Sequence, residues 1–519
     1  MYRLNYMKLK VKCLRRKPMR VGIVLLCAAL VWAQDEPAVF RTGTRLVQVD
    51  VVVREKSRAV MGLTKDDFKV TDNGKPQTIA VFSVRQAAPS VAAPLPPGIV
   101  ANRPQARGGD PVSATVVLID RQNTALEDQG YARLQALKYL DRSKRTEQIA
   151  LYELGTTLKV LQQFTDDRDL LRKAMDKSKM EQSFNLMDGQ NGLLAGVTGN
   201  AAAETRRMAQ LRRNDITTGA FASVARQLEG LPGRKKLIWI TAGLPLHFTT
   251  DTERNGVSSS ESLNMTPQLF RAMKMLNDGN VALYPIDPRG VFGTALSDEG
   301  VEAMISLADL TGGKAFYADN DVAAELEQAV TDTDVTYTLG YYVTEEVQDG
   351  TFHDIRVAVA RPGAEVRYRR GYSAGTKQKP LTEKQRKGTL SDWVVEPLDA
   401  TQLGLQGRAR PVSGRPGYFA VEVIVDPAEL QLENKNGRWV GMFDFALVAN
   451  KGTKPKGLEQ RIKVNLSQDG YLKALNKGII VANTFKTTDA KGKLIAPELK
   501  AVVMDEANGK AGAVRIPVQ

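Results

Sequence analysis

Cysteine and histidine are nearly absent from this chain of 519 residues. The two cysteines, Cys13 and Cys27, lie within the first 33 residues, and the only histidines are His247 and His353. Beyond residue 33 the chain therefore has no disulfide, no thiolate metal site and no cysteine nucleophile. Two histidines so far apart in the sequence also exclude a histidine-rich metal cluster.

The motifs of several enzyme classes are missing as well. The sequence has no G-x-S-x-G nucleophile elbow, no P-loop and no His-Glu pair for zinc. Asp166 and Asp167 form a carboxylate pair, but at the start of a charged helix such a pair is typical of solvated residues that favour the helix N-terminus. We therefore predict that the protein is not an enzyme and has no catalytic residue.

Acidic residues are absent from the beginning of the chain. Residues 1–20 contain eight lysines and arginines, and an apolar run of 13 residues follows at 21–33. The run is short for a membrane span and ends in small or β-branched residues around Trp32. The pattern predicts a signal peptide over residues 1–33 and an exported protein, periplasmic or extracellular. An uncleaved anchor, favoured by the long basic stretch and by Trp32, is the alternative and the only membrane attachment we consider.

The leader also accounts for much of the net charge of +14. It holds eight of the 72 basic residues and none of the 58 acidic ones, so the remaining 64 basic residues exceed the acids by six. Spread over the rest of the chain, this mild excess is not the concentrated basic stripe of a nucleic-acid binder. We expect no nucleic-acid partner.

Residues 34–86 are predicted to form a small N-terminal β module. Residues 45–55 form a strand rich in β-branched residues, and Asp72-Asn73-Gly74 is a hairpin turn signal. Thr64 is a fair N-cap, and Phe68 is expected to be its buried anchor. Residues 87–112 are rich in Pro, Ala and Gly and are predicted to be a linker.

Residues 113–334 alternate between strand and helix patterns, which builds a parallel sheet. The run ATVVLID at 114–120 is apolar, as expected of a strand buried on both faces, and Thr165 is a suitable N-cap for a helix at 165–177. We predict an α/β fold with a doubly wound, mostly parallel sheet. Further strands are expected at 148–155, 157–164, 235–243 and 281–287, further helices at 127–141, 214–230, 266–277, 299–311 and 321–332, with a polar stretch at 176–212 and a loop after 243.

Residues 335–373 return to β patterns, and we expect their strands to pack with the N-terminal module. Their tyrosines and arginines could form a recognition surface, although a half-exposed sheet explains the same pattern; the tyrosines are Tyr337, Tyr341, Tyr342, Tyr368 and Tyr372. Residues 374–389 are rich in Lys and Gly and are predicted to be a second linker. Strand-like runs separated by turns predict a β-sandwich-like domain over 390–519.

The segment Asp120-Arg121-Gln122-Asn123-Thr124, after an apolar strand, resembles the first metal-site segment of von Willebrand factor A (VWA) domains. The wider frame resembles VWFA-related proteins of the acidobacterial type. It covers residues 37–375 and includes the segments LVQVDVVVREKSRAVMGLTKDDFKVTDNGKPQTIAVFSV, WITAGLP and HDIRVAVARPGAEVRYRRGY. The resemblance implies a VWA or Rossmann-like α/β domain.

The resemblance also implies a Mg²⁺ site at the strand ends, but only part of it is present. Asp120 matches the first ligand, Gln122 replaces a serine and Thr124 can replace a second one, while Ala242 stands where an aspartate is expected. Thr198 is a possible stand-in for a threonine of a second loop. Amide oxygens are weaker ligands than carboxylates, so we expect a degenerate site. The competing interpretation is that Asp120, Asn123 and Thr124 satisfy free amide groups before a helix.

We therefore predict an exported VWA-like protein that binds a protein partner without catalysis and without an assured cofactor, Mg²⁺ being the possible one. The binding edge would lie at the carboxyl ends of the strands and include Asn123, Thr241 and Asp287, although Asp287 also suits a plain turn before Pro288. Two alternatives stay open: a Mg²⁺-dependent adhesion module, and a structural envelope component without a ligand-binding role.

Overall fold

The structure is a computed structural model, and every structural statement below refers to the residues that it describes. These are 44–55, 58–86, 95–103, 114–143, 147–178, 200–244, 247–254, 257–264, 266–289, 298–317, 329, 335–344, 351–374, 381–449, 456–488, 492 and 497–518. The predicted signal peptide, Thr198 and most of the helix predicted at 321–332 lie outside them.

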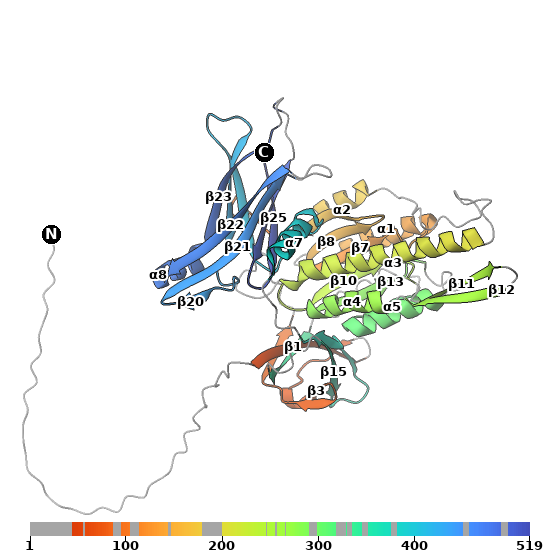
Figure 1. The fold of residues 1–519 in the computed structure, drawn as a ribbon. Coiled ribbons are helices and arrows are strands. Elements are labelled where there is room, and N and C mark those ends of the chain that lie inside the picture. Colours follow the sequence, from red (N-terminus) through yellow and green to blue (C-terminus); the bar gives the residue numbers. More distant parts are fainter. Residues whose placement is uncertain are drawn as a thin grey trace, which may run out of the picture. The chain divides into compact units, whose positions relative to one another are not determined.

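Five strands form the central sheet of a mixed α/β domain, in the order β13-β10-β7-β8-β9 (Figure 1). The first four, β13 (Val281–Ile286), β10 (Lys235–Ile240), β7 (Ala114–Asp120) and β8 (Gln148–Leu154), run parallel to one another. The edge strand β9 (Leu158–Thr165) is antiparallel to β8. Every residue of the four parallel strands is buried, which explains their continuous apolar runs.

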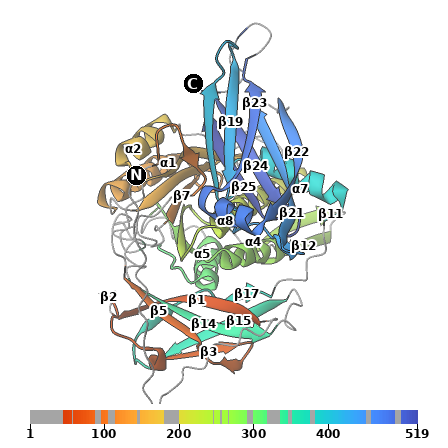
Figure 2. The ribbon, with the colours of Figure 1, turned by 90° about the vertical axis from the view of Figure 1, so that its left-hand side faces the viewer.

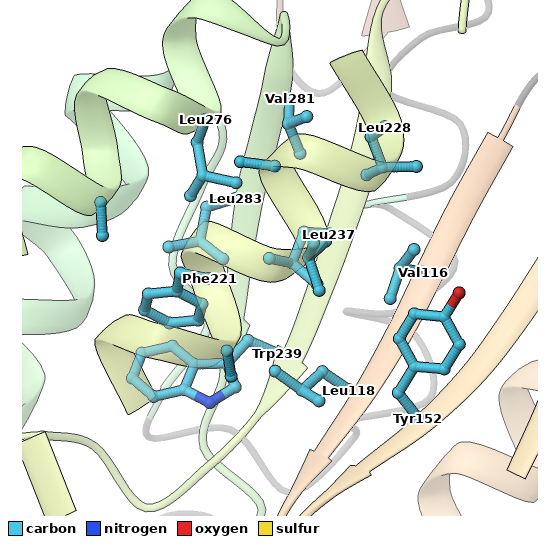
Figure 3. Close-up of a cluster of buried hydrophobic side chains, with 14 of the residues drawn as sticks. Val116, Leu118, Tyr152, Phe221, Leu228, Leu237, Trp239, Leu276, Val281 and Leu283 are labelled. Atoms are coloured by element: carbon cyan, nitrogen blue, oxygen red, sulfur yellow. The ribbon is translucent and has the colours of Figure 1, made fainter. Parts of the chain in front are cut away.

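Helices cover both faces of this sheet because alternate side chains of each strand point to opposite sides. Val116 and Leu118 pack with α3 (Asn200–Glu229), α4 (Thr266–Asp278) and α5 (Asp298–Thr311), as Figure 3 shows in part. Val117 and Ile119 pack with α1 (Leu126–Arg142) and α2 (Arg168–Lys177) on the other side. Each face therefore has its own hydrophobic core.

A β module forms from residues 44–86 together with residues 335–374, two segments that flank the α/β domain in the sequence (Figure 2). One sheet contains β16 (Glu365–Arg367), β1 (Thr44–Glu55), β14 (Val335–Thr344) and β5 (Val81–Gln86), with β2 (Arg58–Ala59) beside β1. A second contains β17 (Gly371–Ser373), β15 (Phe352–Val359), β3 (Phe68–Asp72) and β4 (Lys75–Gln77). Strands of both segments pair directly and share one core.

The turn at Asn73-Gly74 and the helix start at Thr64 lie where the sequence predicts them. Asn73 and Gly74 both have positive φ, 47° and 78°, which is the conformation of a tight hairpin turn between β3 and β4. Thr64 begins the 3-10 helix Lys65–Asp67, where the Asp67 carboxylate accepts hydrogen bonds from the Thr64 amide at 2.7 Å and its hydroxyl at 2.9 Å. Phe68, the next residue, is buried.

Two further antiparallel sheets form the C-terminal part (Figure 1). Their side chains meet in one hydrophobic cluster. The first has β23 (Ile479–Lys486), β19 (Tyr418–Val425), β18 (Leu405–Pro411) and β6 (Val100–Ala101). The second has β20 (Glu433–Lys435), β21 (Arg438–Ala449), β24 (Glu498–Asp505) and β25 (Ala511–Pro517), with β22 (Lys456–Ser467) beside β21 and followed by α8 (Gln468–Lys477).

Both predicted linkers contain regular structure. The segment predicted as a linker at 87–112 contributes β6, which pairs with β18. The second linker, predicted over 374–389, is too long, because α7 (Glu383–Val395) begins within it. A capping box between Thr382 and Gln385 begins this helix. Its buried residues Leu390, Trp393 and Val394 pack in a hydrophobic cluster. The lysines on its exposed face are the reason that the sequence is interpreted as a linker.

Other differences from the predicted elements have local causes. α3 begins at Asn200 rather than 214, since a run of alanines and arginines favours a helix despite its polarity. The predicted loop after 243 contains a hairpin of β11 (His247–Arg254) and β12 (Val257–Asn264). The N-cap of α2 is Asp167 rather than Thr165, because its carboxylate accepts the amides of Asp169 and Leu170. Among the described residues, no helix is both long and apolar enough to cross a membrane.

A buried ion pair lies at the amino ends of the parallel strands. Lys236 Nζ of β10 lies 2.7 Å from Glu147 Oε1, and their side chains are 2% and 5% exposed. Glu147 also accepts hydrogen bonds from the hydroxyls of Thr115 and Tyr139. Charges buried this deeply are tolerated because each is compensated by the other.

We expect either single substitution, Glu147→Gln or Lys236→Met, to lower the free energy of unfolding by about 3–5 kcal/mol, because each leaves one buried charge unpaired. The double variant should lose less than the sum of the two. Urea denaturation at neutral pH measures this, with Arg172→Met as the control: its ion pair with Asp141 is about half exposed, at 49% and 51%, and should matter little. Additive effects of the two substitutions would contradict the prediction.

Candidate functional site

The carboxyl ends of three neighbouring parallel strands bring the predicted site residues to one edge of the sheet. Asp120 ends β7, Thr241 follows β10 and Asp287 follows β13. The register pairs Ile240 with both Ile119 and Ile286, so the three polar residues come from adjacent positions. Open α/β sheets bind ligands at the carboxyl ends of their strands, which is the edge where these polar side chains lie.

Asp120 is the centre of the hydrogen-bond network at this edge. Its Oδ1 accepts from the Asn123 amide at 3.0 Å. Its Oδ2 accepts from Asn123 Nδ2 at 2.8 Å, Trp239 Nε1 at 2.9 Å and Thr241 Oγ1 at 3.1 Å. Trp239 is itself fixed by Phe221 of α3, whose ring meets it edge-on at 5.0 Å (Figure 3). The network therefore ties β7 to β10 and to the helix packed over them.

The electrostatics of Asp120 are those of a desolvated carboxyl group. The residue is 1% exposed. Burial raises the pKa of Asp120, while its hydrogen bonds to Asn123, Trp239 and Thr241 act in the opposite direction. The four groups that donate to it are uncharged. The buried carboxyl group of Asp120 is thus stabilised by hydrogen bonds from neutral donors and not by an opposite charge.

Gln122 differs from its neighbours because its side chain is wholly buried without a hydrogen bond. Its exposed fraction is 0%, and neither Nε2 nor Oε1 has a partner among the described residues. Leaving buried polar groups unpaired costs about 1–3 kcal/mol each, so they are rare in folded proteins. An amide in this state indicates a hydrogen-bonding group that the described residues do not supply.

Thr124 does not cap the helix that follows it. Its hydroxyl accepts the amide of Ala242 at 3.3 Å, and the N-cap position of α1 is Ala125, which has no side-chain cap. The competing interpretation is that Asp120, Asn123 and Thr124 satisfy free backbone amides before the helix. The structure contains one such bond, from the Asn123 backbone amide to the Asp120 carboxyl group. Thr124 therefore links the first strand end to the second rather than serving as a helix cap.

Asp287 is held by an arginine that sequence reasoning missed. Arg289 donates from Nε at 2.9 Å and from Nη2 at 2.7 Å to the two carboxylate oxygens, and its amide donates at 2.9 Å. The hydrogen bond with Asp287 is the main reason that the pKa of Arg289 is raised. The sequence did contain a signal for this ion pair, because Arg289 follows Asp287 by only two residues in PIDPRG.

These residues do not fit a divalent cation. Asp120 already accepts three hydrogen bonds at Oδ2 and one at Oδ1, Asp287 is paired with Arg289, and Ala242 offers no side-chain oxygen. Mg²⁺ requires near-octahedral oxygen ligands, usually with carboxylates among them. Among the described residues, no group of three or more His, Cys, Asp or Glu side chains is placed to hold a metal.

The residues predicted to contact a partner lie beneath the surface. Asn123 is 7% exposed, and Thr241 and Asp287 are 0% exposed. Asn123 Nδ2 also donates to Thr217 Oγ1 of α3 at 2.9 Å. A partner at this edge would first meet the exposed start of α1, where Leu126 is 40% exposed.

The tyrosines of the β module do not form a recognition surface. Tyr337, Tyr341, Tyr368 and Tyr372 are buried, and only Tyr342 is exposed, at 47%. Asp72 accepts hydrogen bonds from the hydroxyls of Tyr341 at 2.9 Å and Tyr372 at 2.8 Å, and lies 2.7 Å from His353 Nδ1. These polar groups satisfy one another in the interior of the module.

Comparisons with known proteins returned no matching family model and no matching curated protein. Several solved structures are similar. An aerotolerance-related membrane protein from Bacteroides fragilis is 13% identical and covers 42% of this chain and 98% of its own, with a TM-score of 0.26. A von Willebrand factor type A protein from Catenulispora acidiphila is 12% identical and covers 76% of this chain and 75% of its own, with a TM-score of 0.26.

A third similar structure is proximal thread matrix protein 1 from the mussel byssus. It is 11% identical and covers 45% of this chain and 49% of its own, with a TM-score of 0.26. At such TM-scores these likenesses decide neither the fold nor the function. The strand order and the hydrogen bonds of the chain itself support the description of the site.

We expect Asp120→Ala to destabilise the protein by about 3–5 kcal/mol, because it leaves four donors without an acceptor in a buried place. Asp120→Asn should cost only about 1–2 kcal/mol, since one acceptor oxygen remains and burial already disfavours the charged form. Denaturation with urea, followed by tryptophan fluorescence, compares the two variants. Equal losses would show that the hydrogen bonds to Asp120 do not organise the strand ends.

Proposed function

We propose that this chain is an exported VWA-like interaction module that binds a protein partner at the strand-end edge of its α/β domain, without catalysis and without a bound metal. The signal peptide predicted over residues 1–33 supports export. The two packed β sheets of the C-terminal part are proposed to form a β-sandwich-like domain. Together with the β module they would act as spacers or as a second binding surface.

The position of the site in the topology supports this proposal. From β7 the chain passes to β8 on one side of the sheet and later to β10 on the other side. The ends of β7 and β10 therefore flank the switch point, and open α/β sheets bind ligands at that place. Asp120 and Thr241 occupy these two ends, so the site lies where the fold itself favours binding.

The single observation that carries the proposal is the unpaired amide of Gln122. A carboxamide has both a donor and an acceptor, and a peptide group of a partner has the same pair. Gln122 lies two residues after Asp120, next to the exposed start of α1. Because the Gln122 side chain is 0% exposed, a partner chain at the strand ends would satisfy both polar atoms only once the residues that cover Gln122 move aside. A cation, by contrast, would have to displace the neutral donors from Asp120.

We expect affinity capture from an envelope extract of the source organism to retain a protein partner in excess EDTA. Gln122→Leu should weaken capture about tenfold, which corresponds to the loss of roughly 1.4 kcal/mol of hydrogen bonding. The matched control is Gln135→Leu on α1: it changes another buried glutamine, whose Oε1 is likewise unpaired but which lies away from the strand ends, and it should leave capture unchanged. Neither variant should lower the melting temperature, and Gln122→Leu should raise it, because it removes two buried polar atoms that have no partner among the described residues.

Other outcomes distinguish the alternatives. Capture that is lost in EDTA and restored by Mg²⁺ would replace this proposal with metal-dependent adhesion. If no protein is captured saturably, either with or without metal, the remaining alternative is a structural envelope component without a ligand-binding role. Equal capture by the Gln122 and Gln135 variants would place the interaction elsewhere on the chain.

A further inference from the structure

Buried polar contacts join the β module to the amino-terminal end of the parallel sheet, and we call these contacts the joint. Asn280 Nδ2 donates to Asp50 Oδ2 at 2.8 Å, and Arg234 donates to the Asp50 carbonyl at 3.2 Å. Arg369, between β16 and β17, donates to the Asn277 carbonyl at 2.7 Å. The joint therefore connects β1 and the segment between β16 and β17, in the β module, to residues in or beside β10, α4 and β13 in the α/β domain.

Lys235, the first residue of β10, is 3% exposed, and its backbone amide donates at 3.0 Å to the carbonyl of Asn280, the residue that bonds Asp50 in the joint. Its Nζ donates one hydrogen bond, to the Leu231 carbonyl at 2.8 Å. An ammonium group has three N–H donors, so a charged Lys235 is poorly satisfied in this place. A neutral amine is less demanding, because it has only two donors and carries no charge to be desolvated.

The charged groups that face Lys235 come from each element around it. Asp50 of β1 and Glu229 of α3 are the acids, and Arg369 and Arg85 of β5 are the bases. Arg234, its neighbour in the chain, is also buried and donates to the Asp50 carbonyl. Asp50 already accepts from Thr338 Oγ1 at 2.6 Å as well as from Asn280. Two acids and two bases therefore act on Lys235 and largely offset one another, so burial decides which form of its amine the joint favours.

We propose that Lys235 makes the joint between the β module and the α/β domain sensitive to pH, so that the joint is held more tightly as the pH rises from neutral. The neutral amine fits the joint, whereas the ammonium adds a charge beside Arg369 and Arg85. This device is independent of the proposed binding at the strand ends, which lies at the opposite end of β10.

The direction follows from proton binding. Burial is the main cause that lowers the pKa of Lys235 to about 7; Asp50 and Glu229 oppose this, and Arg369 and Arg85 add to it. Lysine in an unfolded or solvated chain titrates near about 10.4. Between these two values the open form binds more protons than the closed form, so raising the pH favours closure. Below this range both forms are protonated, and the burial penalty is fully present.

Hydrogen exchange of the full chain measures the joint directly, because two backbone amides bond across it. The Arg370 amide donates to the Leu310 carbonyl at 3.1 Å, and the Ser373 amide donates to Asp278 at 2.7 Å. After correction for the intrinsic exchange rate, we expect their protection to rise at least about tenfold from pH 7 to pH 9. In Lys235→Met the protection should stay within about twofold over the same range.

Lys500→Met is the matched control. Lys500 is also a buried lysine, 1% exposed, and its pKa is lowered to about 8, mainly by burial. Its Nζ donates to the carbonyls of Trp393 at 2.8 Å and Glu396 at 2.6 Å, in the C-terminal part. This variant should keep the pH dependence at Arg370 and Ser373 and change protection only around α7.

Three results would overturn the proposal. The first is equal protection of Arg370 and Ser373 at both pH values in the unmodified protein. The second is an unchanged pH dependence in Lys235→Met, and the third is its loss in Lys500→Met. Lys235→Gln serves as a second neutral variant. If neither neutral variant folds, the proposal also fails, because the neutral side chain is the form that the joint is proposed to favour.

Discussion

Burial of both faces of the parallel sheet is the constraint on which the rest of the structure depends. All residues of β7, β8, β10 and β13 are buried, so their interiors have room only for apolar side chains. Polar groups are confined to the strand ends, where they must satisfy one another or meet a ligand. The ion pair of Glu147, the joint at Lys235 and the network of Asp120 are three solutions to this requirement.

The two ends of the sheet meet the constraint with different chemistry. At the amino ends, Glu147 is compensated by the charge of Lys236. At the carboxyl ends, Asp120 is supported by the neutral donors of Asn123, Trp239 and Thr241. A carboxyl group surrounded by neutral donors is suited to hydrogen bonding, and a cation would have to displace donors from it. This difference favours recognition of a polar partner group over metal binding at the strand ends.

The sequence predicted those parts of the fold whose signals are local. The apolar run at 114–120 and the polar residues after it located β7 and Asp120, and Asn73-Gly74 located a hairpin turn. The contact of Trp239 with Asp120 was not predictable, because it depends on how two strands 119 positions apart are paired. The unpaired amide of Gln122 was hidden for the same reason: satisfaction of a buried group depends on every neighbour. The packed face of α7 was masked by its charged surface residues.

β10 separates the joint from the strand-end site. It is paired with β7 on one side and β13 on the other, so its six residues form ladders with both neighbours. Six extended residues span about 20 Å, well beyond the 7–10 Å or so over which substitutions usually influence one another. Loosening the joint breaks side-chain contacts between the β module and the amino end of the sheet, such as that of Asn280 with Asp50, but none of the ladder bonds around Trp239. The protein thus has the means to respond to pH at one end of the sheet while keeping the geometry of Asp120 and Gln122 at the other.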